Sequence, residues 1–363
     1  MLSEIGSNFW ITPKELTYEN CLTTPAQFGC EGSDYVWMST GRSATSFVLD
    51  TIEKRNPDVR KVAIIPPFTC HTVIEPFLAK GYEVRTFHTG KDLIATASDV
   101  ISVANDENVG VVLFHRFFGV NTIPEIDNAI CELRSHGIIT IEDCTQNIYS
   151  SYPKSSADYF VGSIRKWCGV PDGGFAVCKE GVFSNKPSNA DIKLQEAKKE
   201  ASLLKYEYLF NGNGDKQVFL SKFREAEDIL DAQDRYYRLS DLSAYIQSNL
   251  NIDELKTKRR ENLRIIAEGL SKIKGVHVIF ETLADDEVPL YCPILCDERS
   301  KVQPLLVKNA IYAPVVWPKA DCCPEVDSDA DYLYEHILCI PIDQRYDADD
   351  MTRVINVLKD NYK

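Results

Sequence analysis

A carboxylate and an amine stand in this sequence at places that suit one kind of chemistry. An apolar run ends at residues 141–146 (IEDCTQ), which include Asp143, and Lys166 follows within residues 163–167 (SIRKW). A lysine amine can condense with an aldehyde to form an imine, and a carboxylate can keep a heterocycle protonated. Pyridoxal phosphate (PLP) requires both groups, because its ring withdraws electrons only while the pyridine nitrogen carries a proton. The pair therefore predicts a PLP site.

Each of these two residues also has an ordinary structural interpretation. Asp143 could cap a helix that follows the strand, and Lys166 could be a solvated lysine in a loop. An aspartate at a strand end and a lysine near a turn are both common. The prediction therefore depends on the pair and its surroundings, which include the turn at residues 171–174 (PDGG).

The composition favours two domains that bind neither nucleic acid nor membranes. The chain has 363 residues, 44% of them hydrophobic, which is ample for a sizeable core and too long for one small domain. Its net charge of −14 argues against nucleic acid and anionic membranes, which select a basic face. No apolar stretch approaches the roughly 20 residues of a membrane span. Backbone N–H groups can still hold a phosphate locally in such an acidic protein.

The cysteines and the start of the chain predict a reducing compartment. Twelve cysteines are scattered without a C-x-x-C pair, and several lie in apolar runs, as buried reduced thiols do. A zinc site is the alternative, but its paired ligand spacing is missing, so we expect no metal. Residues 1–6 (MLSEIG) lack the basic and apolar regions of a signal peptide. We therefore expect a cytoplasmic protein.

The first half of the chain alternates short apolar runs with helical patterns. Strands are predicted at 62–66, 83–88, 109–115, 138–142, 157–161 and 174–178, and helices at 70–80 and 123–136, with Gly81 and Gly137 as helix stops. Such alternation predicts an α/β fold with a mostly parallel sheet wrapped by helices. Ligands gather at the carboxyl ends of parallel strands, which is where Asp143 falls.

The second half is helical and charged before a smaller mixed region begins. One long amphipathic helix is predicted over 239–270, strands at 276–280, 290–295 and 337–340, and helices at 301–309 and 349–362. The acidic cluster at 327–331 (DSDAD) lacks the glycine and distal glutamate of a calcium loop, so we expect a solvated acidic loop. We expect a large domain over residues 1–240, with a helical extension at 188–240, and a small C-terminal α+β domain over 241–363.

The Asp143–Lys166 pair and its flanking motifs resemble the fold-type-I PLP enzymes, and among them the sugar aminotransferase (DegT/DnrJ/StrS-type) family. The resemblance runs from about residue 38 to residue 358 and is most specific at the Asp–Lys pair. It implies a large PLP-binding domain of the fold-type-I transferase kind, a smaller α+β domain and a homodimer.

The resemblance implies a phosphate site at residues 38–45 (MSTGRSAT). This segment resembles the family's Gly-Thr-Ala turn, which opens a helix and points N–H groups at the cofactor phosphate. The implied contacts are Gly41, Arg42 and Ser43, with Arg42 in place of the usual threonine. Ser163 is a further implied phosphate donor. An ordinary helix start is the alternative interpretation of this segment.

Two further segments are similar to those that surround the cofactor ring. Residues 141–146 resemble a Glu-Asp-x-x-Gln run, in which Asp143 pairs with the pyridinium nitrogen and Gln146 approaches the ring hydroxyl. Residues 66–71 (PPFTCH) are similar to the segment that carries a stacking aromatic. Cys70 occupies the aromatic's place, so His71 is the candidate for the flat face, and a helix-initial histidine without a ligand is the alternative.

Two other positions depart from the family pattern. Arg116 falls where the family often has histidine, and Tyr236 falls where an asparagine commonly reaches the phosphate of the partner subunit. These departures leave the cofactor prediction intact and bear on the substrate.

The resemblance implies an aminotransferase that uses Lys166 as a Schiff-base lysine and later as a base for the substrate's α-proton. The amino donor would be an amino acid such as glutamate, and the acceptor a nucleotide-linked keto-sugar. A PLP enzyme that acts on another amine or amino acid is one alternative. Sugar dehydratase relatives replace this lysine with histidine, so Lys166 favours transamination. A PLP-binding protein without turnover is the other alternative.

Overall fold

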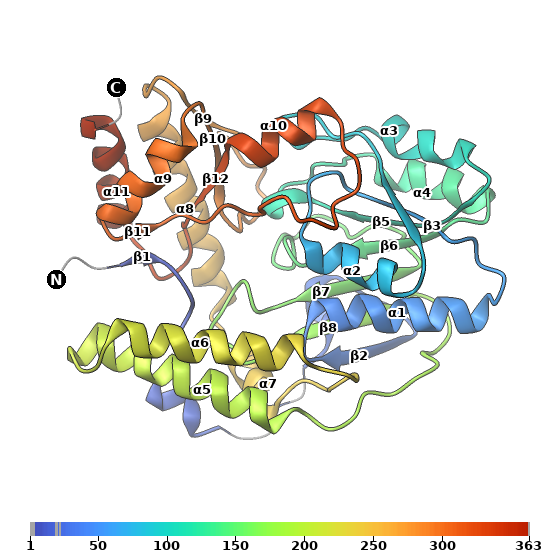
Figure 1. Ribbon diagram of the computed structural model, residues 1–363, viewed down its shortest axis with the longest axis horizontal. Helices are drawn as coiled ribbons and strands as arrows, with labels where there is room; N and C mark the ends of the chain where they lie inside the picture. Colours follow the sequence, from blue (N-terminus) through green and yellow to red (C-terminus); the bar gives the residue numbers. More distant parts are fainter. Residues whose placement is uncertain (1–3, 19–20, 22, 362–363) are drawn as a thin grey trace. The chain divides into compact units, whose positions relative to one another are not determined.

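The computed structural model describes residues 4–18, 21 and 23–361 and divides into two compact units. Unit 1 consists of Met1–Ser7, Asp58–Asp158 and Asn251–Lys363. Unit 2 consists of Asn8–Pro57 and Tyr159–Leu250. Each unit is therefore assembled from stretches that lie far apart in the sequence, as the colours of Figure 1 show. The domain boundary that we expected at residue 240 stays a prediction.

Unit 1 contains a parallel sheet with the strand order β6-β5-β3-β4. Its strands are β3 (Val62–Ile65), β4 (Glu83–Thr86), β5 (Val109–His115) and β6 (Ile139–Asp143). The helices along this stretch are α2 (His71–Ala79), α3 (Ala97–Ile101), η3 (Ser102–Asn105), η4 (Phe117–Gly119) and α4 (Ile126–Ser135). Strands β3 and β5 are buried along their whole length, as their unbroken apolar runs predict. The α/β prediction is confirmed.

A second region of unit 1 is a smaller α+β assembly. Its antiparallel strands are β9 (Val276–Val278), β10 (Cys292–Cys296) and β12 (Ile337–Ile340), and β1 (Ile5–Gly6) pairs with β11 (Ile311–Tyr312). Its helices are α8 (Ile252–Leu270), α9 (Arg299–Lys308), α10 (Ser328–His336) and α11 (Ala348–Asn361). Helices α8 and α11 pack side by side (Figure 1), and one apolar core joins them to the strands.

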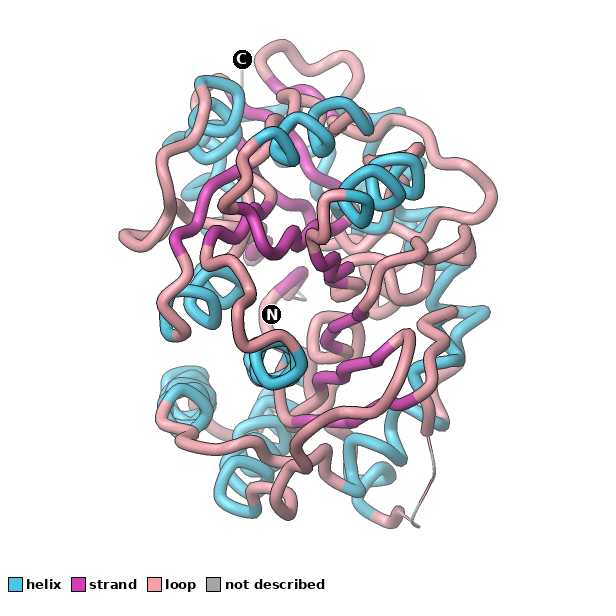
Figure 2. Tube along the Cα trace, turned by 90° about the vertical axis from the view of Figure 1, so that its right-hand side faces the viewer, coloured by secondary structure: helices cyan, strands magenta, loops and turns pink. Residues whose placement is uncertain are grey.

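Unit 2 contains the antiparallel strands β2 (Asp34–Met38), β8 (Gly174–Cys178) and β7 (Tyr159–Ser163) in that order. Its helices are η1 (Pro13–Leu16), η2 (Pro25–Phe28), α1 (Gly41–Arg55), α5 (Ile192–Tyr206), η5 (Glu207–Asn211), α6 (Lys216–Asp231) and α7 (Asp241–Ser248). Helix α1 packs on β7 and β8, and α5 and α6 form a hairpin (Figure 1). Figure 2 shows helices, strands and loops interleaved along the trace.

Two predictions about the second half of the chain are wrong. The helix predicted over 239–270 is two helices, because Asn249 ends α7 and the Asn251 side chain caps α8, accepting the Glu254 N–H at 3.2 Å. The acidic cluster at 327–331 is not a loop. Asp327 caps α10 by accepting the Ala330 N–H at 2.9 Å. The acidic residues in the first turn of α10 are stabilised by the positive end of the helix dipole.

Candidate functional site

Unit 1 presents Asp143 at the carboxyl end of β6. Asp143 is the register partner of His115, the last residue of β5, so both side chains lie on the same face at the same end of the sheet. The Asp143 Oδ1 atom accepts the Thr145 N–H at 2.8 Å, which fixes the direction of the carboxylate. Residues 144–150, all of them described, form turns rather than a helix, so Asp143 is no helix cap.

His115 is a polar residue at this sheet end that the sequence analysis missed. It is buried, with its Nε2 atom 3.1 Å from Thr69 Oγ1 and its Nδ1 atom 3.3 Å from Gln146 Nε2. The Gln146 oxygen accepts the Phe118 N–H at 2.9 Å, so the Gln146 nitrogen must be a donor. This assigns the acceptor role to Nδ1 of His115 and the proton to Nε2, which then donates to Thr69.

This network bears on the predicted role of Gln146. The side chain is buried and already contacts Phe118 and His115, so both of its ends are oriented by the protein. The predicted approach to a ring hydroxyl stays a prediction. The signal for His115 was available, because it is a polar residue that ends an apolar strand at the same edge as Asp143.

The face of β6 opposite to Asp143 holds a buried ion pair. Glu142 accepts the Ser155 N–H at 2.9 Å, and its Oε1 atom lies 3.8 Å from Arg116 Nη1. Burial alone raises the pKa of Glu142, but Arg116 and the neighbouring donors outweigh it, and the net pKa is lowered. Arg116 also donates to the Pro153 carbonyl at 3.0 Å and lies over the Tyr152 ring. Arg116 is therefore the counter-charge of Glu142.

His71 is the first residue of α2 and is exposed. Its Nδ1 atom lies 3.8 Å from the sulfur of Cys70, which occupies the N-cap position, and the Thr72 hydroxyl donates to that sulfur at 3.1 Å. The predicted helix start is confirmed within one residue. The predicted stacking of His71 on a cofactor ring stays a prediction.

In unit 2, the start of α1 lies against the end of β7. Thr40 caps α1 by accepting the Ser43 N–H at 2.9 Å, and Gly41 is the first helical residue. A Cβ atom on Gly41 would lie 3.4 Å from Ser163 Cβ, so the two residues are neighbours. A Cβ atom on Gly174 would overlap the Thr40 carbonyl oxygen, so only glycine allows this close approach. The structure thus brings Gly41 and Ser163 together, and Ser43 lies in the same first turn of α1 as Gly41.

Lys166 lies on a tight turn directly after β7. The Trp167 N–H donates to the Ile164 carbonyl at 3.0 Å, which closes a turn with Lys166 at its third position. The Gly173 carbonyl accepts both the Ser163 hydroxyl at 2.9 Å and the Ile164 N–H at 3.0 Å. Trp167 is fully buried and anchors the turn, whereas Lys166 is half-buried. The backbone of this lysine is therefore fixed.

Two residues that depart from the family pattern are engaged within unit 2. The Arg42 guanidinium forms an ion pair with Asp231 of α6. The Tyr236 hydroxyl donates to the Asp50 carboxylate of α1, and burial together with this contact raises the pKa of Tyr236.

The predicted site residues form two groups, one in each unit. Unit 1 holds His71, Asp143 and Gln146, and unit 2 holds Gly41, Arg42, Ser43, Ser163 and Lys166. Asp143 and Gln146 lie within one turn of each other in unit 1, while His71 starts a separate helix. That both groups act on one cofactor stays a prediction.

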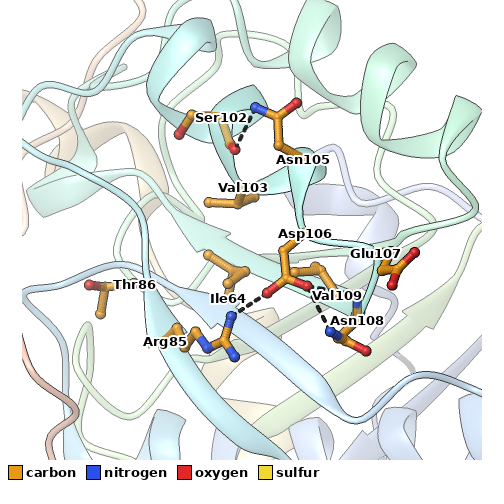
Figure 3. Close-up of a pocket in the computed structure, with 10 residues that line it drawn as sticks. All are labelled: Ile64, Arg85, Thr86, Ser102, Val103, Asn105, Asp106, Glu107, Asn108 and Val109. Atoms are coloured by element: carbon orange, nitrogen blue, oxygen red, sulfur yellow. Dashed lines mark hydrogen bonds and ion pairs between the residues drawn. The ribbon is translucent and has the colours of Figure 1, made fainter.

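A surface cavity of about 680 Å³ in unit 1 is lined by none of the predicted site residues (Figure 3). Its lining includes Val109, which starts β5, whereas His115 ends that strand roughly 20 Å further along. Figure 3 shows Arg85 directed at Asp106, and Arg85 also pairs with Glu83 at 2.7 Å. The positive charge of this cavity is thus already compensated by protein carboxylates.

Further observations concern metals, thiols and membranes. In the part of the chain that the structure describes, no three or more His, Cys, Asp or Glu side chains are grouped so as to hold a metal ion. All twelve cysteines are free thiols. Among the helices in residues 4–18, 21 and 23–361, none combines the length and the apolar character that crossing a bilayer requires.

The chain is similar over its whole length to solved aminotransferases. The sugar aminotransferase CalS13 from Micromonospora echinospora matches with a TM-score of 0.67 and 16% identity, covering 100% of both chains. PseC from Helicobacter pylori, an aminotransferase involved in pseudoaminic acid biosynthesis, matches with a TM-score of 0.70 and 15% identity, covering 98% of this chain and 99% of its own. The chain has the fold of sugar aminotransferases.

A third match is a structure in its PLP form. The putative sugar aminotransferase Spr1654 from Streptococcus pneumoniae, in its PLP form, has a TM-score of 0.66 and 12% identity, covering 99% of this chain and 97% of its own. No protein-family model and no curated protein sequence matches the chain. At these identities the likeness establishes the fold, and activity must be argued from the residues.

Proposed function

We propose that this chain is a PLP-dependent aminotransferase. It takes an amino group from an amino acid such as glutamate and passes it to a nucleotide-linked keto-sugar. One observation carries the proposal. Lys166 lies on a hydrogen-bonded turn directly after a strand whose last residue, Ser163, contacts the first turn of α1. The sugar-aminotransferase fold along the whole chain supports the same conclusion.

The start of α1 fits a phosphate group. The first N–H groups of a helix have no partner within the helix and lie at the positive end of its dipole. Gly41 places no side chain between these groups and Ser163, and the Ser43 hydroxyl lies 2.9 Å from Thr40 Oγ1 at the same helix start. We therefore assign the phosphate to Gly41 and Ser43, with Arg42 as a charged neighbour. Ser163 is assigned as a further donor, which requires its hydroxyl to leave the Gly173 carbonyl that it contacts at 2.9 Å.

The end of β6 fits the protonated side of a pyridine ring. Asp143 supplies a carboxylate whose direction is fixed by Thr145, and such a charge-assisted contact is strong in a dry site. Gln146 supplies an amide nitrogen beside it that His115 orients, and we assign this amide to the ring edge that carries the hydroxyl group. His71 is assigned to the flat face of the ring.

The side chains then divide the work of proton transfer and charge stabilisation. PLP, when bound, withdraws electrons from the substrate carbon that bears the amino group. Lys166 would take the proton from that carbon at its Nζ atom and pass it to the cofactor within the same half-reaction, and it would move a proton in the opposite direction in the second half-reaction. Asp143 keeps its partner nitrogen positive throughout, so the site does not lose its electron sink.

Reduction with sodium borohydride in the presence of PLP tests the assignment of Lys166. The purified protein should take up PLP with a yellow colour, and peptide mapping after reduction should find the cofactor on Lys166. Lys166→Ala should take up no covalent label, while the exposed control Lys193→Ala should be labelled as the wild type is. A label on another lysine would contradict the assignment.

Glutamate and candidate acceptors test the reaction itself. In a single turnover, glutamate should bleach the visible band of the PLP-loaded protein, and a nucleotide-linked keto-sugar should restore it. If only 2-oxo acids restore the visible band, the protein is an aminotransferase that acts on amino acids. A band that glutamate leaves unchanged would favour a PLP-binding protein without turnover.

The proposed activity also has implications for the oligomeric state, the substrate class and the location of the protein. We propose a homodimer, because fold-type-I sites are built at a subunit interface, and light scattering of the purified protein measures it directly. The net charge of −14 supports small-molecule substrates rather than nucleic acid or anionic membranes. The free thiols are consistent with our proposal of a cytoplasmic location.

A further inference from the structure

The last turns of α6 carry two carboxylates that hold two arginines next to the proposed cofactor residues. Both oxygens of Glu227 accept from Arg165 Nη2, at 2.8 and 3.2 Å, and Asp231 forms an ion pair with Arg42. Arg165 directly precedes Lys166 in its turn, and Arg42 lies in the first turn of α1. One helix therefore contacts both segments that the proposed function assigns to the cofactor in unit 2.

The positions of these carboxylates on α6 fit such a role. Glu227 and Asp231 are four residues apart, so they lie on the same face of the helix. Asp231 is the last residue of α6, where the helix dipole disfavours a carboxylate. The ion pair with Arg42 offsets this local conflict, and conflicts of this kind gather at functional sites.

Residues just before α1, just after α6 and in α5 add further contacts between these segments. The Ser39 hydroxyl, just before α1, donates to Gln233 Oε1 at 2.9 Å, and Gln233 Nε2 donates to Asp191 at 2.9 Å. Lys198 of α5 also contacts Glu227, and burial together with the charge of Arg165 lowers the pKa of Lys198. The contacts around α6 thus join α5, the start of α1 and the Lys166 turn.

Both carboxylates are partly exposed, so their effect on local placement can be measured apart from the stability of the whole fold. The side chains of Glu227 and Asp231 are 48% and 60% exposed, and ion pairs this open to solvent contribute little to the free energy of unfolding. Removing Asp231 should therefore leave the fold intact. Glu227 is also the partner of the buried Lys198, so a melting curve of the Glu227→Gln variant must accompany its test. Either change would remove a charge that holds an arginine beside a segment whose placement the chemistry requires.

We propose that Glu227 and Asp231 are positioning residues, which act through Arg165 and Arg42 to hold the Lys166 turn and the first turn of α1 in place. This inference rests on the proposed function. It divides the task, because Glu227 acts on the lysine turn and Asp231 acts on the phosphate-binding turn.

Two variants and two matched controls test the division. Glu227→Gln and Asp231→Asn remove the positioning charges, while Glu225→Gln and Asp228→Asn remove equal charges from exposed positions of the same helix. Hydrogen exchange, measured on the full chain without PLP, should become about tenfold faster at residues 163–170 in Glu227→Gln. In Asp231→Asn the faster exchange should appear at residues 39–46. The controls should match the wild type in both segments.

Loading with PLP adds a second measurement. At saturating PLP, kcat should fall up to roughly 100-fold in Glu227→Gln, because a small misplacement of a reacting group is costly. In Asp231→Asn the main change should be weaker PLP binding. Exchange unchanged in both segments, or equal effects in all four variants, would overturn the positioning role. If the wild type binds no PLP, the proposed function fails, while the exchange data still decide the positioning role.

Discussion

The Asp143 and Lys166 regions are built by different physical means. Around Asp143, polar groups are buried and paired, and in the ion pair beneath it the side chains of Arg116 and Glu142 are 4% and 0% exposed. Around Lys166, the backbone is held by the Gly173 carbonyl and by close approaches that only glycine allows, and the ion pair of Arg165 with Glu227 is partly open to solvent.

This difference matches the two tasks of the proposed chemistry. A carboxylate that keeps a ring protonated must hold one position and one charge, which a buried network of hydrogen bonds favours. A lysine that carries a cofactor and then moves a proton needs a fixed base and a mobile end. The turn supplies the fixed base through backbone hydrogen bonds and the buried Trp167.

Replacing the lysine should have the largest effect on catalysis. Lys166→Ala removes both the tether and the base, so we expect kcat to fall by roughly 10⁴-fold or more. The fold should be unchanged, because the turn is closed by the Ile164 and Trp167 backbone groups rather than by the lysine side chain. Steady-state kinetics and a melting curve measure the two effects. A variant that retains a tenth of the wild-type rate would exclude Lys166 as the base.

The buried pair beneath Asp143 should show the next largest effect, on stability. Arg116→Met leaves Glu142 buried without its main cation, and breaking such a pair costs about 3–5 kcal/mol of unfolding free energy. Urea unfolding measures this loss. The control Arg134→Met removes an exposed partner of Asp158 and should change the free energy by less than about 1 kcal/mol. Equal losses in both variants would show that burial of the pair is unimportant.

Neutralising the ring partner should slow catalysis without unfolding the protein. Asp143→Asn keeps the shape of the side chain and its contact with Thr145, but it cannot hold a ring proton. We expect kcat to fall roughly 10²- to 10³-fold, as when one preorganised electrostatic contact is lost. The visible spectrum of bound PLP should shift as well. Undiminished turnover would remove Asp143 from the mechanism.

Local patterns in the sequence were sufficient for much of the fold. Strands β5, β8 and β12 have the predicted bounds, because each is an apolar run with clear ends. Gly81 and Gly137 follow their helices with φ values of +73° and +68°, as helix-ending glycines do.

Contacts between distant residues could not be predicted in this way. Strand β2 was missed because it is only partly buried and its pairing with β8 joins residues far apart in the sequence. The pairing of Arg116 with Glu142 and the network of His115 depend on the register of β5 with β6. No local pattern encodes that register, so these parts of the site emerged only with the structure.

Asp172 near Lys166 and Glu142 near Asp143 are equally buried carboxylates, so their pKa shifts can be compared directly. Asp172, just before Gly173, contacts the hydroxyl groups of Ser240 and Ser243, at 2.7 and 2.5 Å. Burial outweighs these donors and raises the pKa of Asp172 to about 6, whereas Arg116 and its neighbours lower that of Glu142. A carboxyl group whose pKa is raised on folding stabilises the protein fully below its unfolded pKa. That contribution is lost as the pH rises through the folded pKa.

Asp172→Asn should therefore change how stability depends on pH. Between pH 4 and pH 7 the wild type should lose roughly 2–3 kcal/mol of unfolding free energy relative to this variant, from about two pKa units at 1.36 kcal/mol each. Urea unfolding at several pH values measures the difference, with the exposed Asp228→Asn as the control. A difference that stays constant across this range would mean that the serine donors keep Asp172 ionised. In that case Asp172 would resemble Glu142, and both regions would stabilise the ionised form of a buried carboxyl group.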